Sequence, residues 1–170
     1  MPIQDWWNQD SLVWHFAMFD SGPAVGEDHG VEAPEAWVRA LKAVARDMRC
    51  LRYGRDVQLD GVVWELAVNS GYAVTIGWQG ADGVGGFGLC HGLSMDATFG
   101  EASVWAADTV QWELAGYEFV HWPSRGHHVL VPRLREAVPV WVDPHNDGTV
   151  AAIGELCEHS GEWGLPATDR

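Results

Sequence analysis

Apolar residues recur at helical spacing between Pro34 and Gly54. The intervals are four, three, four and three residues, and the positions are Trp37, Leu41, Val44, Met48 and Leu51. At about 100° per residue these positions fall within one narrow arc, which is the apolar stripe of a core-facing helix. Pro34 stands where a first helical residue is expected, because the N–H group that proline lacks has no intrahelical partner there. The segment therefore predicts a long amphipathic helix that must pack against another layer.

The opposite side of this helix is basic. Its cations recur at intervals of three, four and three residues, at Arg39, Lys42, Arg46 and Arg49. Such a face is ordinarily solvated or paired with the chain's own carboxylates, and it is also a candidate docking face for an anionic partner. The 170-residue chain has 24 Asp and Glu against 10 Lys and Arg, for a net charge of −14. Because the field of the whole molecule repels anions, the solvated face is the simpler interpretation.

Two alternating runs downstream of the helix predict a β-hairpin over residues 62–78. A three-residue loop at 69–71 would end in glycine, which tolerates the left-handed conformation that such loops require. This loop places apolar residues opposite each other in the pairs Val68–Tyr72, Leu66–Val74 and Trp64–Ile76. A third strand is expected near residues 87–95.

The remaining segments complete an α+β fold. Glu101–Ala115 predicts a helix ended by Gly116. Residues 11–19 are expected to be a buried strand or a short helix. Residues 129–134 and 138–142 are expected to be two short extended runs. Residues 149–158 are expected to form a strand, a helix, or one turning into the other. We expect a long amphipathic helix packed on a small antiparallel sheet over residues 1–117, with a ribbon-like extension over 118–170 packed on it as one structural unit.

Composition excludes several classes of protein. The length fits one domain, and no apolar run approaches the roughly 20 residues that cross a bilayer. The N-terminus has no basic region followed by an apolar stretch, so a cytoplasmic protein is expected, as a monomer or homodimer. The acidic charge argues against nucleic acid and anionic membranes as partners. The cysteines Cys50, Cys90 and Cys157 form no CxxC pair, which argues against a disulfide framework.

One glycine-rich motif matches the sequence pattern of a dinucleotide-binding site but not its expected structural context. Residues 83–88, Gly-Val-Gly-Gly-Phe-Gly, match G-x-G-x-x-G. A dinucleotide site needs a helix starting inside the motif within a βαβ unit, and neither is expected here. We interpret the motif as a flexible hairpin loop and expect no cofactor.

Tryptophan is unusually abundant, with 11 in the chain. Its large apolar area suits cores, interfaces and ligand cavities, and a tryptophan-rich core is the simplest interpretation. The alternative is a pocket lined by Trp64, Trp78, Trp105 and Trp112, with His15 or His91 as acid–base groups. Trp105 and Trp112 are seven residues apart and so share a face of the predicted helix.

The C-terminal part carries a series of short motifs. They read His121-Trp122-Pro123, His127-His128-Val129-Leu130-Val131-Pro132, Val138-Pro139-Val140-Trp141-Val142-Asp143-Pro144 and Ile153-Gly154-Glu155-Leu156. This series resembles the end of a group of small uncharacterised proteins from actinomycete-type bacteria, in which a Trp-Pro-x-Cys-Pro and valine-Trp-x-Cys-Pro ribbon looks like a reduced zinc ribbon. The resemblance covers residues 117–156 and implies a bacterial, cytoplasmic setting. Ser124 or Arg125 and Asp143 stand at the cysteine positions.

Metal binding at this ribbon is not expected. The residues that remain as weak candidate ligands are His127, His128, Asp143 and His145. They lack the thiolates of a closed structural zinc site, and the two extended runs have apolar side chains of their own to bury. We therefore predict that the chain folds without metal.

Two functions follow as hypotheses. In the first, an acidic protein of the immunity, antitoxin or accessory type binds a basic protein partner, with tryptophan anchors supplying contact energy. In the second, a tryptophan-lined pocket with histidine or carboxylate groups binds a small molecule or catalyses its conversion. The sequence does not decide whether the protein is an enzyme.

Overall fold

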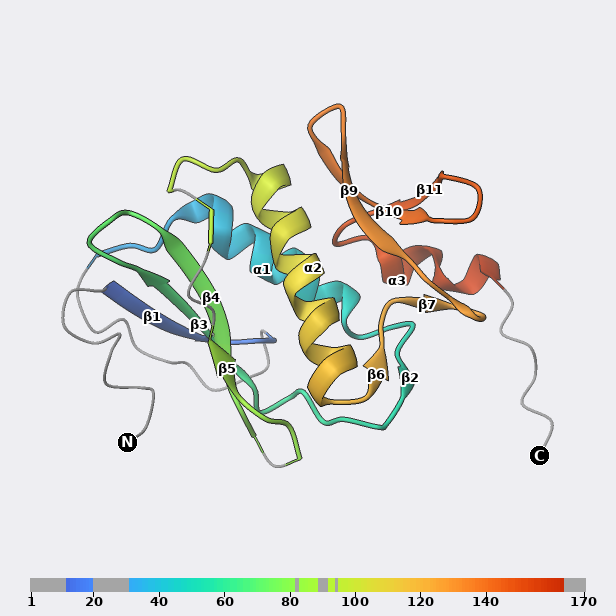
Figure 1. Ribbon diagram of the computed structural model, residues 1–170, viewed down its shortest axis with the longest axis horizontal. Coiled ribbons are helices and arrows are strands. Elements are labelled where there is room, and N and C mark those ends of the chain that lie inside the picture. The colour runs from blue at the N-terminus through green and yellow to red at the C-terminus, as the bar shows by residue number, and fades with distance from the viewer. Residues whose placement is uncertain (1–11, 20–30, 82, 89–91, 94, 164–170) are drawn as a thin grey trace.

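The chain folds into two antiparallel sheets on either side of a helical layer (Figure 1). The computed structural model describes residues 12–19, 31–81, 83–88, 92–93 and 95–163. The first sheet has the order β1-β3-β4-β5, with bounds Leu12–Ala17, Val63–Val68, Val74–Gln79 and Phe87–Gly88. The helical layer holds α1 (Glu35–Asp47) and α2 (Phe99–Tyr117). The second sheet has the order β11-β10-β9, with bounds Gly148–Ala152, Val138–Asp143 and Val131–Arg135. The predicted α+β class is confirmed.

Short elements connect these layers. β2 (Tyr53–Gly54) pairs with β6 (Val120–His121), and β7 (Ser124–Arg125) pairs with β8 (His128–Val129). The chain continues after β11 into α3 (Leu156–His159) and a 3-10 turn (Ser160–Trp163). None of the helices in the described ranges has the length and apolar content needed to cross a lipid bilayer.

The stripe of α1 is buried as predicted, but the helix is shorter than the stripe. Trp37, Leu41, Val44 and Met48 have no exposed surface. The helix ends at Asp47, and Leu51 lies beyond it with a positive φ of 56°. Three alanines widen the buried face, because Ala40, Ala43 and Ala45 also contact the core.

The predicted hairpin forms with a different register. Val68 lies opposite Val74, Leu66 opposite Ile76 and Trp64 opposite Trp78. The loop therefore has five residues, and Tyr72 rather than Gly71 adopts the positive φ, at 60°. The Asn69 side chain closes this loop by accepting hydrogen bonds from Gly71 N and Ala73 N. A shift of two residues keeps each side chain on its predicted face, so the alternation held while the register was wrong.

The glycine-rich motif, residues 83–88, follows β4, and its last two residues form β5. It is not a loose loop. Gly85 donates its N–H to Glu118 Oε1 at 2.7 Å, and its carbonyl accepts from Trp78 Nε1 at 2.8 Å.

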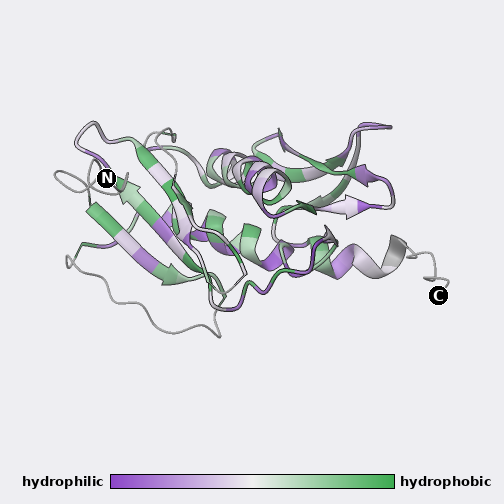
Figure 2. Ribbon diagram, turned by 60° about the horizontal axis from the view of Figure 1, so that its bottom comes forward, coloured by the Kyte–Doolittle hydropathy of each residue, from purple (hydrophilic) through white to green (hydrophobic). Residues whose placement is uncertain are grey.

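Residues 120–156 join the same core as the first 117 residues. Leu130, Trp141, Ile153 and Leu156 belong to one buried cluster with the α1 stripe. Residues 149–158 follow the third of the predicted alternatives, since strand β11 is followed by helix α3. Figure 2 shows hydrophobic and polar segments alternating along the strands of the first sheet, as expected for strands with one buried face.

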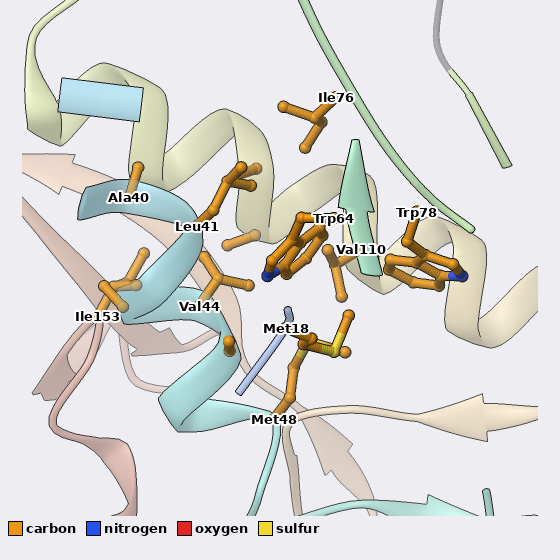
Figure 3. Packing of buried hydrophobic residues seen from close by; sticks show 14 of the residues in the cluster. Met18, Ala40, Leu41, Val44, Met48, Trp64, Ile76, Trp78, Val110 and Ile153 are labelled. Carbon is orange, nitrogen blue, oxygen red and sulfur yellow. The ribbon is translucent and has the colours of Figure 1, made fainter. Parts of the chain in front are cut away.

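The core contains six fully buried or nearly fully buried indoles, at Trp14, Trp37, Trp64, Trp78, Trp122 and Trp141. Figure 3 shows Trp64 and Trp78 beside Val110 of α2 and Met48. Aromatic rings meet edge to face, with centroids 5.6 Å apart for Trp64–Trp78 and 5.1 Å for Trp122–Trp141. Such pairs add to the burial energy of the rings. A tryptophan-rich core, the simplest of the predicted roles, is therefore confirmed for these residues.

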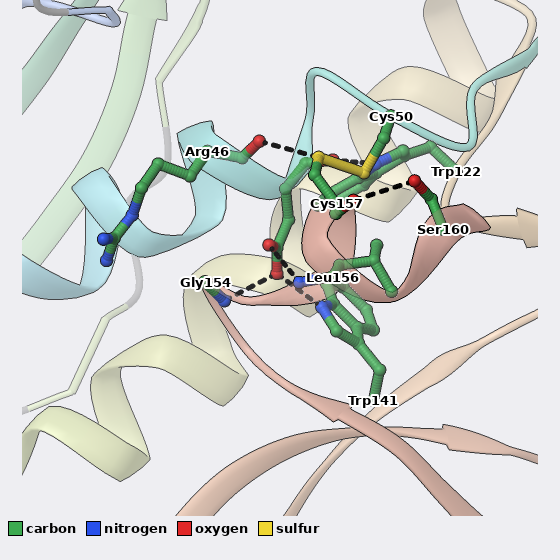
Figure 4. Close-up of a disulfide and its surroundings, with 9 residues drawn as sticks. Arg46, Cys50, Trp122, Trp141, Gly154, Leu156, Cys157 and Ser160 are labelled. Atoms are coloured by element: carbon green, nitrogen blue, oxygen red, sulfur yellow. Dashed lines mark hydrogen bonds between the residues drawn. A yellow bond between two sulfur atoms is a disulfide. The ribbon is translucent and has the colours of Figure 1, made fainter. Parts of the chain in front are cut away.

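A buried carboxylate fastens the C-terminal segment to α1. Asp47 is fully buried at the end of the helix. Its side chain accepts hydrogen bonds from Trp141 Nε1 at 2.7 Å, Gly154 N at 2.7 Å and Leu156 N at 3.0 Å (Figure 4). The donors come from β10 and from the chain leading into α3, so one side chain positions two segments about a hundred residues further along the chain.

The environment of Asp47 disfavours its charge. Burial raises the pKa of Asp47 from 3.8 to about 6, although the three hydrogen bonds and the charge of Arg46 lower it. The C-terminal end of a helix is also the negative end of its dipole, where a carboxylate is unfavourable. Trp122 Nε1 donates to the backbone carbonyl of Asp47 at 3.0 Å.

A disulfide joins the same two segments. Cys50 follows α1 and Cys157 lies in α3, with Cα atoms 5.6 Å apart and 107 residues between them in sequence (Figure 4). The absence of a CxxC pair argued against a disulfide framework, but the structure contains this single long-range bond. Spacing motifs detect cysteines that are close in sequence, whereas the fold brings these two together through the contacts of Asp47.

Candidate functional site

The outward face of α2 carries alternating acids and tryptophans. The helix begins with a capping box, in which Glu101 N donates to Thr98 Oγ1 and Thr98 N donates to Glu101 Oε2. From there Glu101, Trp105, Asp108 and Trp112 recur at intervals of four, three and four residues, which places them on one side of the helix. We call these four residues the α2 face.

A groove of about 430 Å³ runs between the α2 face and β9. From α2 it is lined by Glu101, Val104, Trp105 and Asp108, and from elsewhere by Leu93, Pro132, Arg133 and Leu134. Its volume lies within the range of ligand pockets. The half-buried Trp105 meets Trp37 edge to face at 5.3 Å, so its ring is held against the core. The groove thus combines one fixed indole, two carboxylates and one arginine.

Beyond the groove, α2 runs into β6, which lies next to β2 (Figure 1). Four large aromatic side chains of these elements and of the segment that joins α2 to β6 are exposed. Trp112 and Tyr117 are each 74% exposed, and Phe119 and Tyr53 are each 70% exposed. Monomeric proteins normally bury such side chains, and exposed aromatic residues are enriched at interfaces. We call these four residues the aromatic corner.

The backbone beneath the aromatic corner is tightly held. Glu118 is buried; its side chain forms an ion pair with Arg55 and accepts from Gly85 N at 2.7 Å. Arg55 Nε also donates to the carbonyl of Glu118 at 3.0 Å. Phe119 has a positive φ of 57°, and a Cβ on Gly54 would lie 2.3 Å from the Phe119 carbonyl oxygen. The aromatic side chains therefore project from a fixed frame.

The sequence around Trp112, Tyr117 and Phe119 is acidic, whereas Tyr53 lies between Arg52 and Arg55. Between Arg55 and Arg125 the sequence contains nine Asp or Glu and no Lys or Arg. Helix α2 has three carboxylates and no basic residue. Burial raises the pKa of Glu113, and the charge of the neighbouring Glu118 raises it further.

The predicted tryptophan pocket does not form as a unit. Trp64 and Trp78 are buried in the core and are not among the residues that line the groove. Trp105 lines the groove, and Trp112 is exposed about two turns further along α2. His15 lies on β1 and its Nε2 is 3.1 Å from Glu65 Oε2 on the neighbouring strand, away from the groove lining. His91 lies outside the described residues.

The ribbon residues do not assemble a metal site. His128 Nδ1 and His145 Nε2 are 2.6 Å apart, and Asp143 accepts from His145 N and pairs with Arg125. His127 is exposed. Within the described ranges, no three His, Cys, Asp or Glu side chains are placed to hold one metal ion. Folding without metal stays a prediction.

The four basic-face residues, in contrast, are brought together. Arg39, Lys42, Arg46 and Arg49 line a second cavity, of about 290 Å³, with the rings of Phe19 and Phe99. The regular spacing of these four basic residues predicted that they share one face of the helix. Nothing in the sequence marked the two phenylalanines, which come from segments before and after α1.

Three structural features had weak signals in the sequence. Asp47 follows Ala40 and Ala43 at intervals of three and four residues, so it lies on the apolar face of the helix, where a charged side chain is unusual. Tyr117 and Phe119 flank the buried Glu118, but their exposure depends on the path of the chain from α2 into β6.

No family model matches this chain, and no match was found among curated proteins or solved structures. The resemblance of the C-terminal ribbon stays an expectation.

Proposed function

We propose that this chain is a binding protein that docks a basic protein partner on the α2 face and the aromatic corner. The observation that carries the proposal is Trp112, which is 74% exposed, one turn from Asp108 on α2. Indole is the best ring for a cation–π contact, and an adjacent carboxylate adds an ion pair to the same Lys or Arg. A basic partner thus finds both contacts at one place.

The charge distribution supports fast and selective association. A net charge of −14 attracts a basic protein over long range and repels acidic ones. Aromatic side chains on a rigid frame lose little conformational freedom on binding. The groove beside Trp105 would accept an apolar side chain of the partner, which is the arrangement of an interface anchor.

The test uses Trp112→Ala with Tyr117→Ala as the binding variant, and Tyr72→Ala as the control. Tyr72 is equally exposed, at 71%, but lies in the β3–β4 turn. Captured proteins from the source lysate are identified and quantified by mass spectrometry, at low and high salt. We expect a basic protein that is retained by the wild type and by Tyr72→Ala, lost with the binding variant, and weakened by salt.

The affinity of the captured partner then gives the quantitative result. Trp112→Ala alone should raise Kd by roughly 30-fold, the effect of an interface hot spot of about 2 kcal/mol. A partner that binds the double variant as tightly as the wild type would refute the proposal.

The groove supports a second candidate function, a small-molecule-binding protein or enzyme. It combines Trp105 with two carboxylates, Glu101 and Asp108, although no histidine is among its described lining residues. Quenching of tryptophan fluorescence by a ligand, lost in Glu101→Gln with Asp108→Asn, would favour this function over protein binding.

A further inference from the structure

The cavity between α1, Phe19 and Phe99 is a concentration of positive charge in a strongly acidic protein. Four of the chain's ten Lys and Arg residues line it. It contains no carboxylate among its described lining residues, Met18, Phe19, Arg39, Lys42, Ala45, Arg46, Arg49 and Phe99.

Two of the cations are held by aromatic rings. The Arg39 guanidinium carbon lies 4.8 Å from the centroid of the Phe99 ring, and that of Arg49 lies 4.2 Å from the centroid of the Phe19 ring. Stacking uses the flat face of a guanidinium and leaves its N–H donors on the edge. The rings therefore position the arginines without consuming their hydrogen-bonding capacity.

The basic residues of the cavity differ from the other arginines of the described ranges. Arg52 and Arg133 donate to backbone carbonyls, Arg55 and Arg135 bond carboxylates, and Arg125 pairs with Asp143. Among the residues that the structure describes, the side chains of Arg39, Lys42, Arg46 and Arg49 form neither a hydrogen bond nor an ion pair within 4.0 Å.

Helix stability does not account for this arrangement. Cations near the C-terminal end of a helix interact favourably with its dipole, which explains Arg46 in the last turn. The effect fades beyond one turn, so Arg39 and Lys42 in the earlier turns of α1 need another reason. Repulsion among four neighbouring cations is unfavourable unless an anion offsets it.

We propose that this cavity binds a small multivalent oxyanion, a molecule carrying phosphate groups. Guanidinium groups bind phosphate oxygens in pairs, and lysine adds a point charge. The volume of about 290 Å³ fits a compact ligand. A nucleic acid would need an extended basic surface, whereas the positive charge here is confined to one helix side and its end, and nine acids follow without a Lys or Arg before Arg125.

The test is calorimetric titration with inorganic pyrophosphate at fixed ionic strength. Lys42→Gln and Arg46→Gln are the variants, because both residues are exposed and neither stacks on a ring. Arg135→Gln removes one positive charge elsewhere and is the control. We expect one saturable site per chain, an affinity lowered roughly tenfold by each cavity variant, and a change below about twofold in the control.

Two further measurements locate the ligand and exclude other sources. Pyrophosphate should shift the backbone amide signals of Ala45 and Phe99 in NMR spectra of the wild type, which also shows that the protein is folded. A single-stranded DNA oligonucleotide should bind more weakly than pyrophosphate. Absence of saturable pyrophosphate binding, equal loss in Arg135→Gln, or tighter binding of the oligonucleotide would each overturn the proposal. Trp112→Ala should leave pyrophosphate binding unchanged, which separates this site from the proposed protein interface.

Discussion

Both long helices of this protein end at a buried carboxylate, but the two carboxylates are satisfied in different ways. Asp47, at the end of α1, receives neutral donors only: one indole and two backbone amides. Glu118, the C-cap residue of α2, is paired with the guanidinium of Arg55 and one backbone amide. Each carboxylate connects its helix to segments distant in the sequence.

The two sets of partners give the two carboxylates different electrostatic environments. The hydrogen bonds from neutral groups and the charge of Arg46 offset only part of the cost of burying Asp47, so burial dominates and its pKa rises. The arginine beside Glu118 supplies the opposite charge directly. The Asp47 end also has a covalent link, the Cys50–Cys157 bond, whereas no disulfide lies at the Glu118 end among the described residues. We therefore expect the Asp47 end to contribute more to stability and to depend on pH.

The largest effect is expected for Asp47→Ala. It leaves two buried N–H donors and one partly buried N–H donor without acceptors, and the free energy of unfolding should fall by about 3–5 kcal/mol. Urea denaturation followed by circular dichroism at neutral pH measures the change. The exposed Asp56→Ala is the control and should change stability by less than about 0.5 kcal/mol. A loss of similar size in both variants would contradict the role assigned to Asp47.

Loss of the disulfide should come next. The bond closes a long loop, and removing it with Cys50→Ser and Cys157→Ser should lower the free energy of unfolding by about 2–4 kcal/mol. Cys90→Ser is the control. Titration of free thiols in protein taken from the source cells should find one thiol per chain; three would show the reduced state typical of the cytoplasm, where such bonds are rare.

The pH dependence separates the two helix ends. The folded-state pKa of Asp47 is raised from 3.8 to about 6, so the folded protein binds this proton more tightly than the unfolded chain does. The stabilisation by protonated Asp47 is therefore present below about pH 4 and is lost as pH rises to about 6, a change of roughly 3 kcal/mol. Denaturation at a series of pH values measures it. Asp47→Asn should make the free energy of unfolding nearly independent of pH between about pH 4 and pH 6. The same pH dependence in Asp47→Asn as in the wild type would show that another group causes the change.

The smallest effect is expected at the end of α2. Glu118→Gln keeps the shape of the side chain but removes the charge that pairs with Arg55, and should lower the free energy of unfolding by about 1–2 kcal/mol. Glu113→Gln removes a charge whose pKa is raised by burial and by Glu118, so stability should stay the same or rise slightly. Thermal unfolding of both variants tests the opposite signs, and destabilisation by Glu113→Gln would show that Glu113 has a favourable partner.

The sequence by itself determined the local elements of this protein. The three- and four-residue spacing of Trp37, Leu41 and Val44 determined α1, and alternation determined the strands of the hairpin. The same spacing put Trp105 and Trp112 on one face of α2, and grouped the cations of the second cavity. These patterns are readable because the contacts that they reflect lie within one or two turns or along one strand.

Only the tertiary structure decided which distant groups meet. The partners of Asp47 are 94 to 109 residues away, and Cys50 and Cys157 are 107 apart. The hairpin register depended on the Asn69 side chain and on the packing of Trp64 against Trp78 rather than on the glycine of the loop. The same packing buried Trp64 and Trp78 while leaving Trp112 exposed, although all three are indoles. Residue type fixes what a side chain prefers, but long-range packing fixes which of these preferences is met, because burial depends on neighbours that no local pattern specifies.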